Sequence, residues 1–375
     1  MFPLAIQLPE GLTPNLDLLL PELIVVGTAL GAILPELLRP PGRRAVATAW
    51  TTLIGLLCAF VMVLVIGPSD RLVLEVVDEG GKVVSGLRMD AFAVFCRALV
   101  TGGGALLVLI SMGFTRRMDR GHGEFYAILL FALLGIMFVA GVSDLLSLFV
   151  CLELVTIMAY VLAAFRRNDL RSTEAGLKYL VIGAVSTAVL LLGIGLIYGW
   201  TGTMSLEMIG DKVWAAVDTG TSMPAIFLLG VAFLISGLLF KIGGVPFHVW
   251  IPDVYQGAPS PVVSFLSTGS KLAGLVLLIR LAQAVFVPWA EAGHGLIWVW
   301  LIGGLSAITV VFGLLGAISQ RSIKRLFAYS SIGHAGYLLM GVAAIAATGW
   351  PEEGAAHGAT AILYYLMAFF FTNLT

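Results

Sequence analysis

Charged residues are scarce in this chain. Lysine, arginine, aspartate and glutamate make up 11% of its 375 residues, whereas hydrophobic residues make up 59%. Soluble domains carry about 25% charged residues. The composition therefore excludes a soluble globular protein, and it leaves no polar stretch long enough for a separate soluble domain.

Cysteine is nearly absent as well. The three cysteines, Cys58, Cys96 and Cys151, lie in apolar segments without metal-ligand spacing, which argues against an iron–sulfur cluster or a disulfide framework. No Gly-x-Gly-x-x-Gly motif follows an expected strand, and the run Gly102–Gly104 lies inside an apolar segment, where close helix packing explains it. We therefore expect the chain to bind no redox cofactor and no metal.

Long apolar runs dominate what is present. A helix of about 20 apolar residues crosses the roughly 30 Å hydrocarbon core of a bilayer, whereas barrel strands are shorter and alternate polar with apolar residues. The runs therefore predict an all-α polytopic membrane protein with about 11 transmembrane helices. They are residues 17–38, 44–67, 89–114, 124–142, 144–165, 173–199, 223–245, 260–287, 295–319, 324–347 and 358–375.

Basic residues concentrate in alternate loops. The loops after odd-numbered runs contain Arg39, Arg43, Arg44, Arg116, Arg117, Arg120, Arg166, Arg167, Arg171, Arg321, Lys324 and Arg325. The loops after even-numbered runs contain few basic residues (Arg71, Lys82, Arg88, Lys212) and most of the acidic ones, among them Asp78, Glu79, Glu207, Asp211, Asp218, Glu352 and Glu353. The positive-inside rule then places the N-terminus outside and the arginine-rich loops in the cytoplasm.

Two outer segments are longer than simple turns. Residues 71–89 alternate loosely around Gly80-Gly81, which predicts a small hairpin. Residues 203–218 place apolar side chains among polar ones at helical spacing, which predicts an amphipathic helix at the membrane interface. We expect both segments to cap the outer ends of the spans.

Ionisable residues deep inside the runs are the strongest functional signal. Lys271 lies about 12 residues into its run, or roughly 18 Å, and Glu153 lies at a similar depth. A charge at the bilayer centre costs at least about 2.5–3.5 kcal/mol, so such residues usually serve transport. Lys241 joins this group, and Lys178 lies shallower. By contrast, we expect two arginines, Arg97 and Arg280, to extend to the membrane boundary.

The seventh run must be interrupted. One helix over residues 224–257 would measure about 50 Å, which exceeds the hydrocarbon thickness. Gly243-Gly244 and Pro246 follow Lys241 directly and predict the break. Transporters build ion sites near the midplane from such discontinuous helices. His248 lies just beyond the break, where a histidine can relay protons.

These residues carry a family resemblance. The sequence reads KIGGVPFHVWIPDVYQGAPSP over Lys241–Pro261 and STGSK over Ser267–Lys271, with LEL, LKY and AYSSIGHAGY at 152–154, 177–179 and 328–337. Together they resemble the antiporter-like subunits of bacterial NADH:quinone oxidoreductase, respiratory complex I, and subunit N more than subunits L and M. The motifs extend over most of the chain and occur in the family's order.

The resemblance implies a role for each residue. Glu153 matches the glutamate of the family's fifth span, Lys241 the lysine of its broken seventh helix, and Lys271 the eighth-span lysine that leads toward a second half-channel. Lys178 and His248 match further polar positions of the same proton route. Pairing and unpairing of Glu153 with Lys241 is expected to switch the lysine between holding and passing a proton.

The resemblance also implies an organisation and a setting. The fold is expected to be an antiporter-like bundle of 14 helices with two inverted five-helix repeats. Residues 1–122 would form spans 1–3, residues 123–288 the first repeat, and residues 289–375 an incomplete second one. We expect further sequence beyond Thr375, because the chain ends inside an apolar run.

The implied partners are other membrane subunits of complex I, with M-like and K-like neighbours, in the bacterial inner (plasma) membrane. NADH, FMN, iron–sulfur clusters and quinone would bind to those other subunits. Two other functions would use a similar chain: a subunit of a multisubunit cation/proton antiporter, or a structural subunit of a membrane-bound hydrogenase complex.

Overall fold

The computed structural model describes residues 15–77, 83–221, 223–289, 296–348 and 356–374. Within this part, ten helical segments are long and apolar enough to cross a membrane, and they coincide with the first ten predicted spans. The predicted all-α polytopic fold is therefore confirmed. The helical elements are η1 (Leu16–Leu19), α1 (Leu20–Gly31), α2 (Leu34–Leu38), α3 (Pro41–Ile66), α4 (Ala91–Thr115), α5 (His122–Ala140), α6 (Leu145–Ala163), α7 (Leu170–Thr201), α8 (Leu206–Asp218), α9 (Ala225–Ile242), α10 (Ile251–Gly257), α11 (Ser260–Phe265), η2 (Leu266–Ser270), α12 (Lys271–Leu281), η3 (Ala282–Phe286), α13 (Val287–Trp289), α14 (Leu296–Ile318), α15 (Ile323–Thr348) and α16 (Ala356–Leu374).

The eleventh predicted span corresponds to α16. It is helical, and its apolar portion, Ala361–Asn373, is shorter than the other spans. It packs against α15 and α4, so the last helix of this chain contacts one of the first. The acidic residues Glu352 and Glu353 of the preceding loop lie outside the described residues.

Short polar side chains start several of these helices. Asp90, Asp144 and Asp169 precede α4, α6 and α7, and each accepts a hydrogen bond from a backbone N–H of the first helical turn. Ser205 does the same for α8. These caps satisfy N–H groups that a helix leaves free at its start, which is necessary where helix ends approach the membrane.

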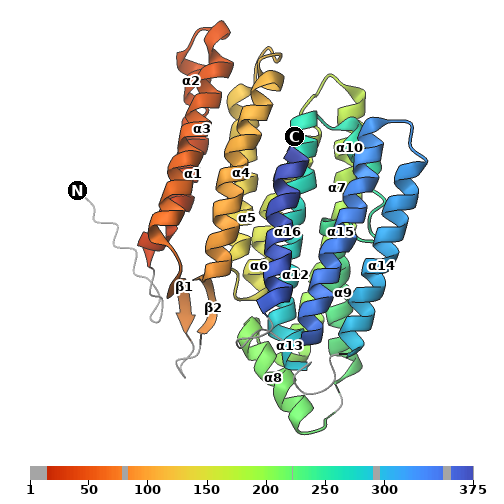
Figure 1. The fold of residues 1–375 in the computed structure, drawn as a ribbon. Coiled ribbons are helices and arrows are strands. Elements are labelled where there is room, and N and C mark those ends of the chain that lie inside the picture. The colour runs from red at the N-terminus through yellow and green to blue at the C-terminus, as the bar shows by residue number, and fades with distance from the viewer. Residues whose placement is uncertain (1–14, 78–82, 222, 290–295, 349–355, 375) are drawn as a thin grey trace.

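The predicted hairpin and the predicted amphipathic helix are both confirmed. Strands β1 (Ser69–Val77) and β2 (Val83–Met89) pair in antiparallel fashion, and the turn with Gly80, Gly81, Asp78, Glu79 and Lys82 lies outside the described residues. Helix α8 buries Leu206, Ile209 and Val213 along one side. Figure 1 places β1, β2, α8 and α13 at one end of the bundle and α2 and α10 at the other.

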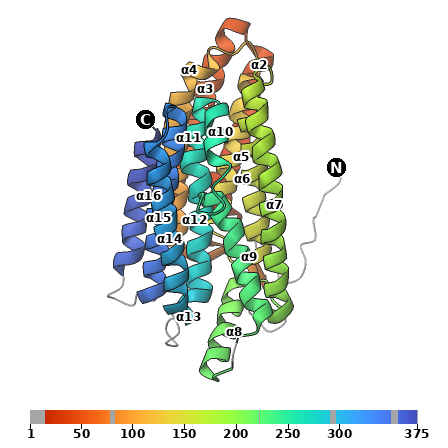
Figure 2. The same cartoon turned by 90° about the vertical axis from the view of Figure 1, so that its right-hand side faces the viewer.

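Helix α12 forms the centre of the bundle. Every one of its side chains is buried, and it contacts α5, α6, α9 and α15. Because α12 is covered on all sides by protein, the residue with which it begins, Lys271, is removed from both lipid and bulk water. The two helices α9 and α10 occupy different portions of the bundle's length beside it (Figure 2).

The predicted break in the seventh span is confirmed. Helix α9 ends at Ile242, and Gly243 takes the left-handed backbone conformation with φ of 85°. The N–H groups of Gly243 and Gly244 both bond to the Leu239 carbonyl, at 2.8 Å each. The Val245 N–H bonds to Thr309 Oγ1 of α14 at 3.1 Å. Neighbouring groups thus satisfy backbone donors that the break removes from the helix, as the membrane interior requires.

Candidate functional site

Lys241 lies at the end of α9, immediately before the break. Its side chain is 3% exposed, and its ammonium donates to Thr156 Oγ1 on α6. The nitrogen also lies 5.6 Å from the centroid of the Tyr160 ring and 5.4 Å from that of Phe240. The partners of this buried cation are therefore a hydroxyl and two aromatic faces, not a carboxylate.

Lys271 lies on the other side of the break. It is 1% exposed and donates to both the carbonyl and the hydroxyl of Ser331 on α15, the latter at 2.6 Å. Its stem passes the break itself, because a Cβ placed on Gly243 would be 3.8 Å from Lys271 Cε. Ser331 in turn lies 3.4 Å from the Tyr255 hydroxyl of α10.

A π-helical segment, η2, leads directly into Lys271. The sequence predicts a helix over 260–287 and gives no warning of this wider turn, which covers Leu266–Ser270. Such turns occur frequently at functional sites, because they disturb the regular backbone ladder and reposition the side chains that follow. The lysine of α12 is thus preceded by an irregular turn, just as the lysine of α9 is followed by one.

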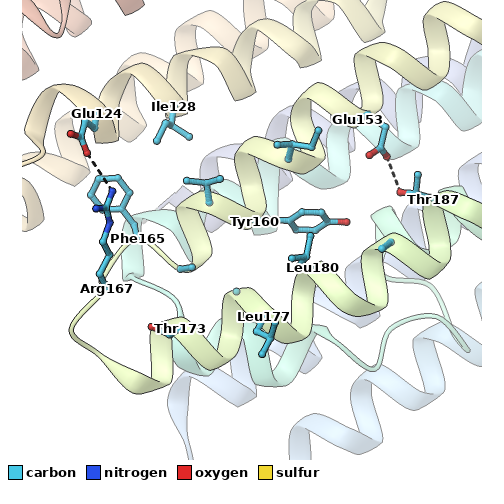
Figure 3. Close-up of a pocket in the computed structure, with 15 residues that line it drawn as sticks. Glu124, Ile128, Glu153, Tyr160, Phe165, Arg167, Thr173, Leu177, Leu180 and Thr187 are labelled. Atoms are coloured by element: carbon cyan, nitrogen blue, oxygen red, sulfur yellow. Dashed lines mark hydrogen bonds and ion pairs between the residues drawn. The ribbon is translucent and has the colours of Figure 1, made fainter.

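Glu153 lies on α6 and lines a groove of about 770 Å³ between α6 and α7. It is half-buried and accepts a hydrogen bond from Thr187 of α7 at 2.8 Å. Figure 3 shows this pair at one end of the groove and the Glu124–Arg167 pair at the other, with Tyr160 between them. The groove walls are otherwise mostly apolar.

Glu153 and Lys241 approach one another without forming an ion pair. No Glu153–Lys241 ion pair within 4.0 Å exists among the described residues. Thr156, which accepts from Lys241, lies one helical turn from Glu153 on the same helix. The structure therefore holds the lysine beside its expected partner rather than on it.

Lys178 is not buried, contrary to its placement inside the sixth span. Its side chain is 44% exposed and forms ion pairs with Glu174 at 2.8 Å and with Asp253 of α10 at 3.0 Å. Asp253 also pairs with Arg325 of α15 at 3.4 Å. These four residues surround a polar pocket of about 320 Å³ near the end of the bundle that carries the arginine-rich loops. The shallow position of Lys178 explains its exposure.

His248 lies in the turn between α9 and α10. It is half-buried, and its ring centroid is 6.0 Å from that of Phe312 on α14. Its Nδ1 has no hydrogen-bond partner within the described residues. The structure therefore brings Lys241 and Lys271 to the break but directs His248 toward α14.

The expectation that Arg97 reaches the membrane boundary is wrong. Its side chain is 0% exposed, and it forms an ion pair with Glu22 of α1 at 2.8 Å and donates to Met89 Sδ. Glu22 is itself 1% exposed. The guanidinium meets a carboxylate inside the protein, so it has no need to extend outward.

Arg280 is also paired, and its partner Asp90 is the residue that caps the start of α4 beside β2. It is 8% exposed and donates twice to Asp90, at 2.6 and 2.8 Å, and once to the Ala140 carbonyl. Burial opposes the ionisation of Asp90, but the hydrogen bonds and the charge of Arg280 outweigh it and hold the pKa of this carboxyl below its ordinary range.

Several polar side chains near the lysines were not identified as site residues from the sequence. Thr156 and Ser331 accept from the lysines, and His334 Nδ1 of α15 lies 2.5 Å from the Tyr365 hydroxyl of α16, one turn beyond Ser331. A signal for Ser331 and His334 was present, because both belong to the AYSSIGHAGY segment. Thr156 had none, since its role depends on how α6 is rotated toward α9.

The fold and this site define a class of protein. Buried lysines on both sides of a discontinuous helix, inside a bundle of membrane-spanning helices, characterise ion-translocating membrane proteins. The chain belongs to the NADH:quinone oxidoreductase/Mrp antiporter transmembrane family, whose model matches residues 142–374.

Individual relatives and solved structures show which proteins this chain is similar to. NADH-quinone oxidoreductase subunit N of Geobacillus sp. (strain WCH70) is 38% identical over 366 residues, which cover 96% of this chain and 70% of that protein. A chain of respiratory complex I from Thermus thermophilus with bound aureothin aligns with a TM-score of 0.69 at 30% identity, over 94% of this chain and 68% of that one. A chain of the Mrp complex from Dietzia sp. DQ12-45-1b aligns with a TM-score of 0.76 at 23% identity, over 95% of this chain and 36% of that one, which shows a common fold.

Proposed function

We propose that this chain is the proton-translocating subunit N of a bacterial NADH:quinone oxidoreductase. The observation that carries the proposal is the pair of buried lysines, Lys241 and Lys271, on the two sides of the break between α9 and α10. Each is held by hydroxyl or carbonyl oxygen, so each can give up its proton without leaving a carboxylate unpaired. The 38% identity to a subunit N over most of the chain supports the same assignment.

Glu153 is the proposed switch for Lys241. Two unit charges at an effective dielectric constant of 20 attract by about 4 kcal/mol at 4 Å and by about 1.7 kcal/mol at 10 Å. Shortening the Glu153–Lys241 separation from 10 to 4 Å would therefore change the proton affinity of the lysine by roughly 2.5 kcal/mol. This is comparable to the ~2.3 kcal/mol needed to move one charge against 100 mV. Movements in neighbouring subunits would drive the exchange.

Lys178 and His248 are proposed for the two flanks of this route. Lys178 belongs to the ion-pair cluster with Asp253 and Arg325, beside a polar pocket from which protons can enter. His248 carries an unpartnered ring nitrogen within the described structure, which leaves it able to accept a proton. Protons would pass from Lys241 to Lys271 and leave through α15 and α16, where His334 and Tyr365 meet.

The assembly follows from this proposal. NADH, FMN, iron–sulfur clusters and quinone bind to other subunits, and this chain contacts M-like and K-like neighbours in the plasma membrane. Residues 1–122 form the N-terminal spans, 123–288 the first antiporter-like repeat and 289–375 part of the second. The arginine-rich loops face the cytoplasm and the N-terminus faces outward, as the charge distribution favours.

Alanine substitutions test the proposal in the intact complex. Lys241→Ala, Lys271→Ala and Glu153→Ala should each abolish NADH-driven acidification of membrane vesicles, while NADH oxidation by the assembled complex stays measurable. Lys212→Ala is the matched control, because Lys212 lies on α8 and donates to the Thr201 carbonyl, away from the route. Normal acidification in the Lys241 or Glu153 variant would overturn the proposal.

The dependence on sodium distinguishes the proposed function from the second function that the fold allows, a cation/proton antiporter. The family includes Mrp antiporters, and the Dietzia chain has the same fold. A cation/proton antiporter subunit would translocate protons only when sodium is exchanged across the membrane. We expect NADH oxidation to drive proton translocation in sodium-free vesicles. An absolute requirement for sodium would favour the antiporter function.

A further inference from the structure

Two buried tyrosine hydroxyls near the lysines make no well-aligned hydrogen bond to protein within the described residues. Tyr160 of α6 is 8% exposed and Tyr179 of α7 is 0% exposed, and neither hydroxyl meets a hydrogen-bond partner at proper geometry within the described residues. Native proteins satisfy almost all of their buried polar atoms, with protein groups or with ordered water. Two such atoms on neighbouring rings are therefore places where water can bind.

The two tyrosines fill the interval between the lysines. The Tyr160 ring lies beside the Lys241 ammonium and contacts the Tyr179 ring edge to face, with 4.7 Å between centroids. The Tyr179 hydroxyl lies near Ser270, the last residue of η2 and the one before Lys271. Tyr179 is therefore the link between the surroundings of the first lysine and those of the second.

Helix α7 is shaped to hold the Tyr160 hydroxyl. A Cβ added to Gly183 would lie 1.8 Å from Tyr160 Oη, so any other residue at this position would displace the hydroxyl. Tyr179, Gly183 and Thr187 follow one another at intervals of four residues and so share a face of α7. Thr187 binds Glu153 at the far end of this face. The face connects Glu153, Tyr160 and Tyr179 in order.

We infer that the hydroxyls of Tyr160 and Tyr179, with water as their hydrogen-bond partner, relay protons from Lys241 to Lys271. A hydroxyl accepts a hydrogen bond while it donates one, so it can take a proton on its lone pair as it passes its own onward. The ammonium of Lys241 loses one proton, the neutral amine of Lys271 gains one, and the tyrosines end unchanged. The inference rests on the proposed function, because it connects two lysines that the proposal places on the route.

A purely structural role makes a different prediction. The Tyr179 ring stacks on Trp250 with 4.3 Å between centroids, and phenylalanine would preserve that stacking. If the rings only fill space, removal of the hydroxyls leaves proton transfer unchanged. If the hydroxyls relay protons, phenylalanine keeps the fold and slows the transfer.

The first test removes the two hydroxyls and uses another tyrosine of α7 as the control. Tyr179→Phe, and Tyr160→Phe on α6, should each slow NADH-driven proton translocation by roughly 10-fold or more at an unchanged thermal midpoint of the complex. Tyr198→Phe is the control, since Tyr198 lies on α7 with 46% of its surface exposed. The inference is overturned if the Tyr160→Phe/Tyr179→Phe double variant translocates protons at the same rate as Tyr198→Phe.

The second test moves the hydroxyl without removing it. Gly183→Ala should slow translocation as Tyr160→Phe does, whereas Gly195→Ala on the same helix should not, because a Cβ there meets no atom within 4 Å. In all slowed variants the residual translocation should show a larger solvent deuterium effect than the unaltered complex, a change that altered packing does not cause. An unchanged isotope effect counts against the relay even if a variant is less stable.

The lysine variants distinguish a failure of the tyrosine relay from a failure of the proposed function. Loss of translocation in Lys241→Ala and Lys271→Ala, together with normal rates in the tyrosine double variant, removes the relay and leaves the proposed function intact. Normal translocation in the lysine variants removes the proposed function itself.

Discussion

At the scale of single residues, the bundle treats its buried cations in two ways. Arg97 and Arg280 are held by carboxylates, Glu22 and Asp90, whereas Lys241 and Lys271 are held by hydroxyl and carbonyl oxygens. A guanidinium keeps its charge under all ordinary conditions, so a buried one needs a permanent counter-charge. An ammonium can lose its proton. The choice of partner thus distinguishes arginines with a fixed counter-charge from lysines that have none as a contact.

The Glu22–Arg97 pair gives the first prediction at this scale. Glu22→Gln leaves the guanidinium buried without its counter-charge and should destabilise the protein by about 3–5 kcal/mol. The double variant Glu22→Gln/Arg97→Gln removes both charges and should recover much of this loss. Thermal denaturation of the detergent-solubilised complex measures both. If the losses of stability in the single variants Glu22→Gln and Arg97→Gln add up to the loss in the double variant, the two residues are not energetically coupled.

At the scale of elements, the break between α9 and α10 lets the stem of Lys271 pass close to the end of α9. Gly243 ends α9 in a left-handed conformation, and its missing side chain leaves room for Ile251 and for the Lys271 stem. Both requirements favour glycine, because other residues resist this backbone conformation and would overlap with their neighbours.

Gly243→Ala should therefore impair both stability and translocation. The left-handed conformation costs a residue with a Cβ about 1–2 kcal/mol, and that Cβ would lie 2.2 Å from Ile251 Cδ1. Gly303→Ala in α14 is the control, because a Cβ there meets no atom within 4 Å and alanine favours a helix by roughly 0.5–1 kcal/mol. Thermal midpoints and vesicle acidification should both fall for Gly243→Ala only; equal behaviour of the two variants would contradict this role of the break.

Elements were predictable where a local signal determines them. Apolar run length fixes the spans, Gly243-Gly244 and Pro246 fix the break, and the alternation in 71–89 fixes the hairpin. The partners of the charged residues were not predictable in this way. That Glu22 meets Arg97, or that Thr156 meets Lys241, depends on the rotation of one helix against another, which periodicity within a single apolar helix does not encode.

The π-helical turn before Lys271 shows the same limit. Residues Leu266–Ser270 contain no proline, and their composition suits a regular helix as well as a wide turn. The turn is adopted inside a fully buried helix, where contacts with its neighbours outweigh the preference of the segment itself. The lysine is therefore identifiable from the sequence, whereas the irregular backbone that leads to it is not.

At the scale of the whole molecule, charge distinguishes the two ends of the bundle. The end with α2 and α10 carries the arginine-rich loops, and the end with β1, β2 and α8 carries Glu207, Asp211 and Asp218 of α8 (Figure 1). By the positive-inside rule we predict that the arginine-rich end faces the cytoplasm.

Cysteine labelling of the assembled complex tests the orientation directly. Arg120 follows α4 at the basic end and Asp218 ends α8 at the acidic end, and both are exposed. In right-side-out vesicles a membrane-impermeant maleimide should label Asp218→Cys and leave Arg120→Cys unlabelled, and inside-out vesicles should reverse the result. The unsubstituted chain measures background from Cys58, Cys96 and Cys151, all within membrane-spanning helices. Labelling of Arg120→Cys from outside would show that the topology is the reverse of the predicted one. Lys178 and its ion-pair cluster lie at the same end as the arginines. The side from which this cluster is proposed to receive protons would then be reversed as well.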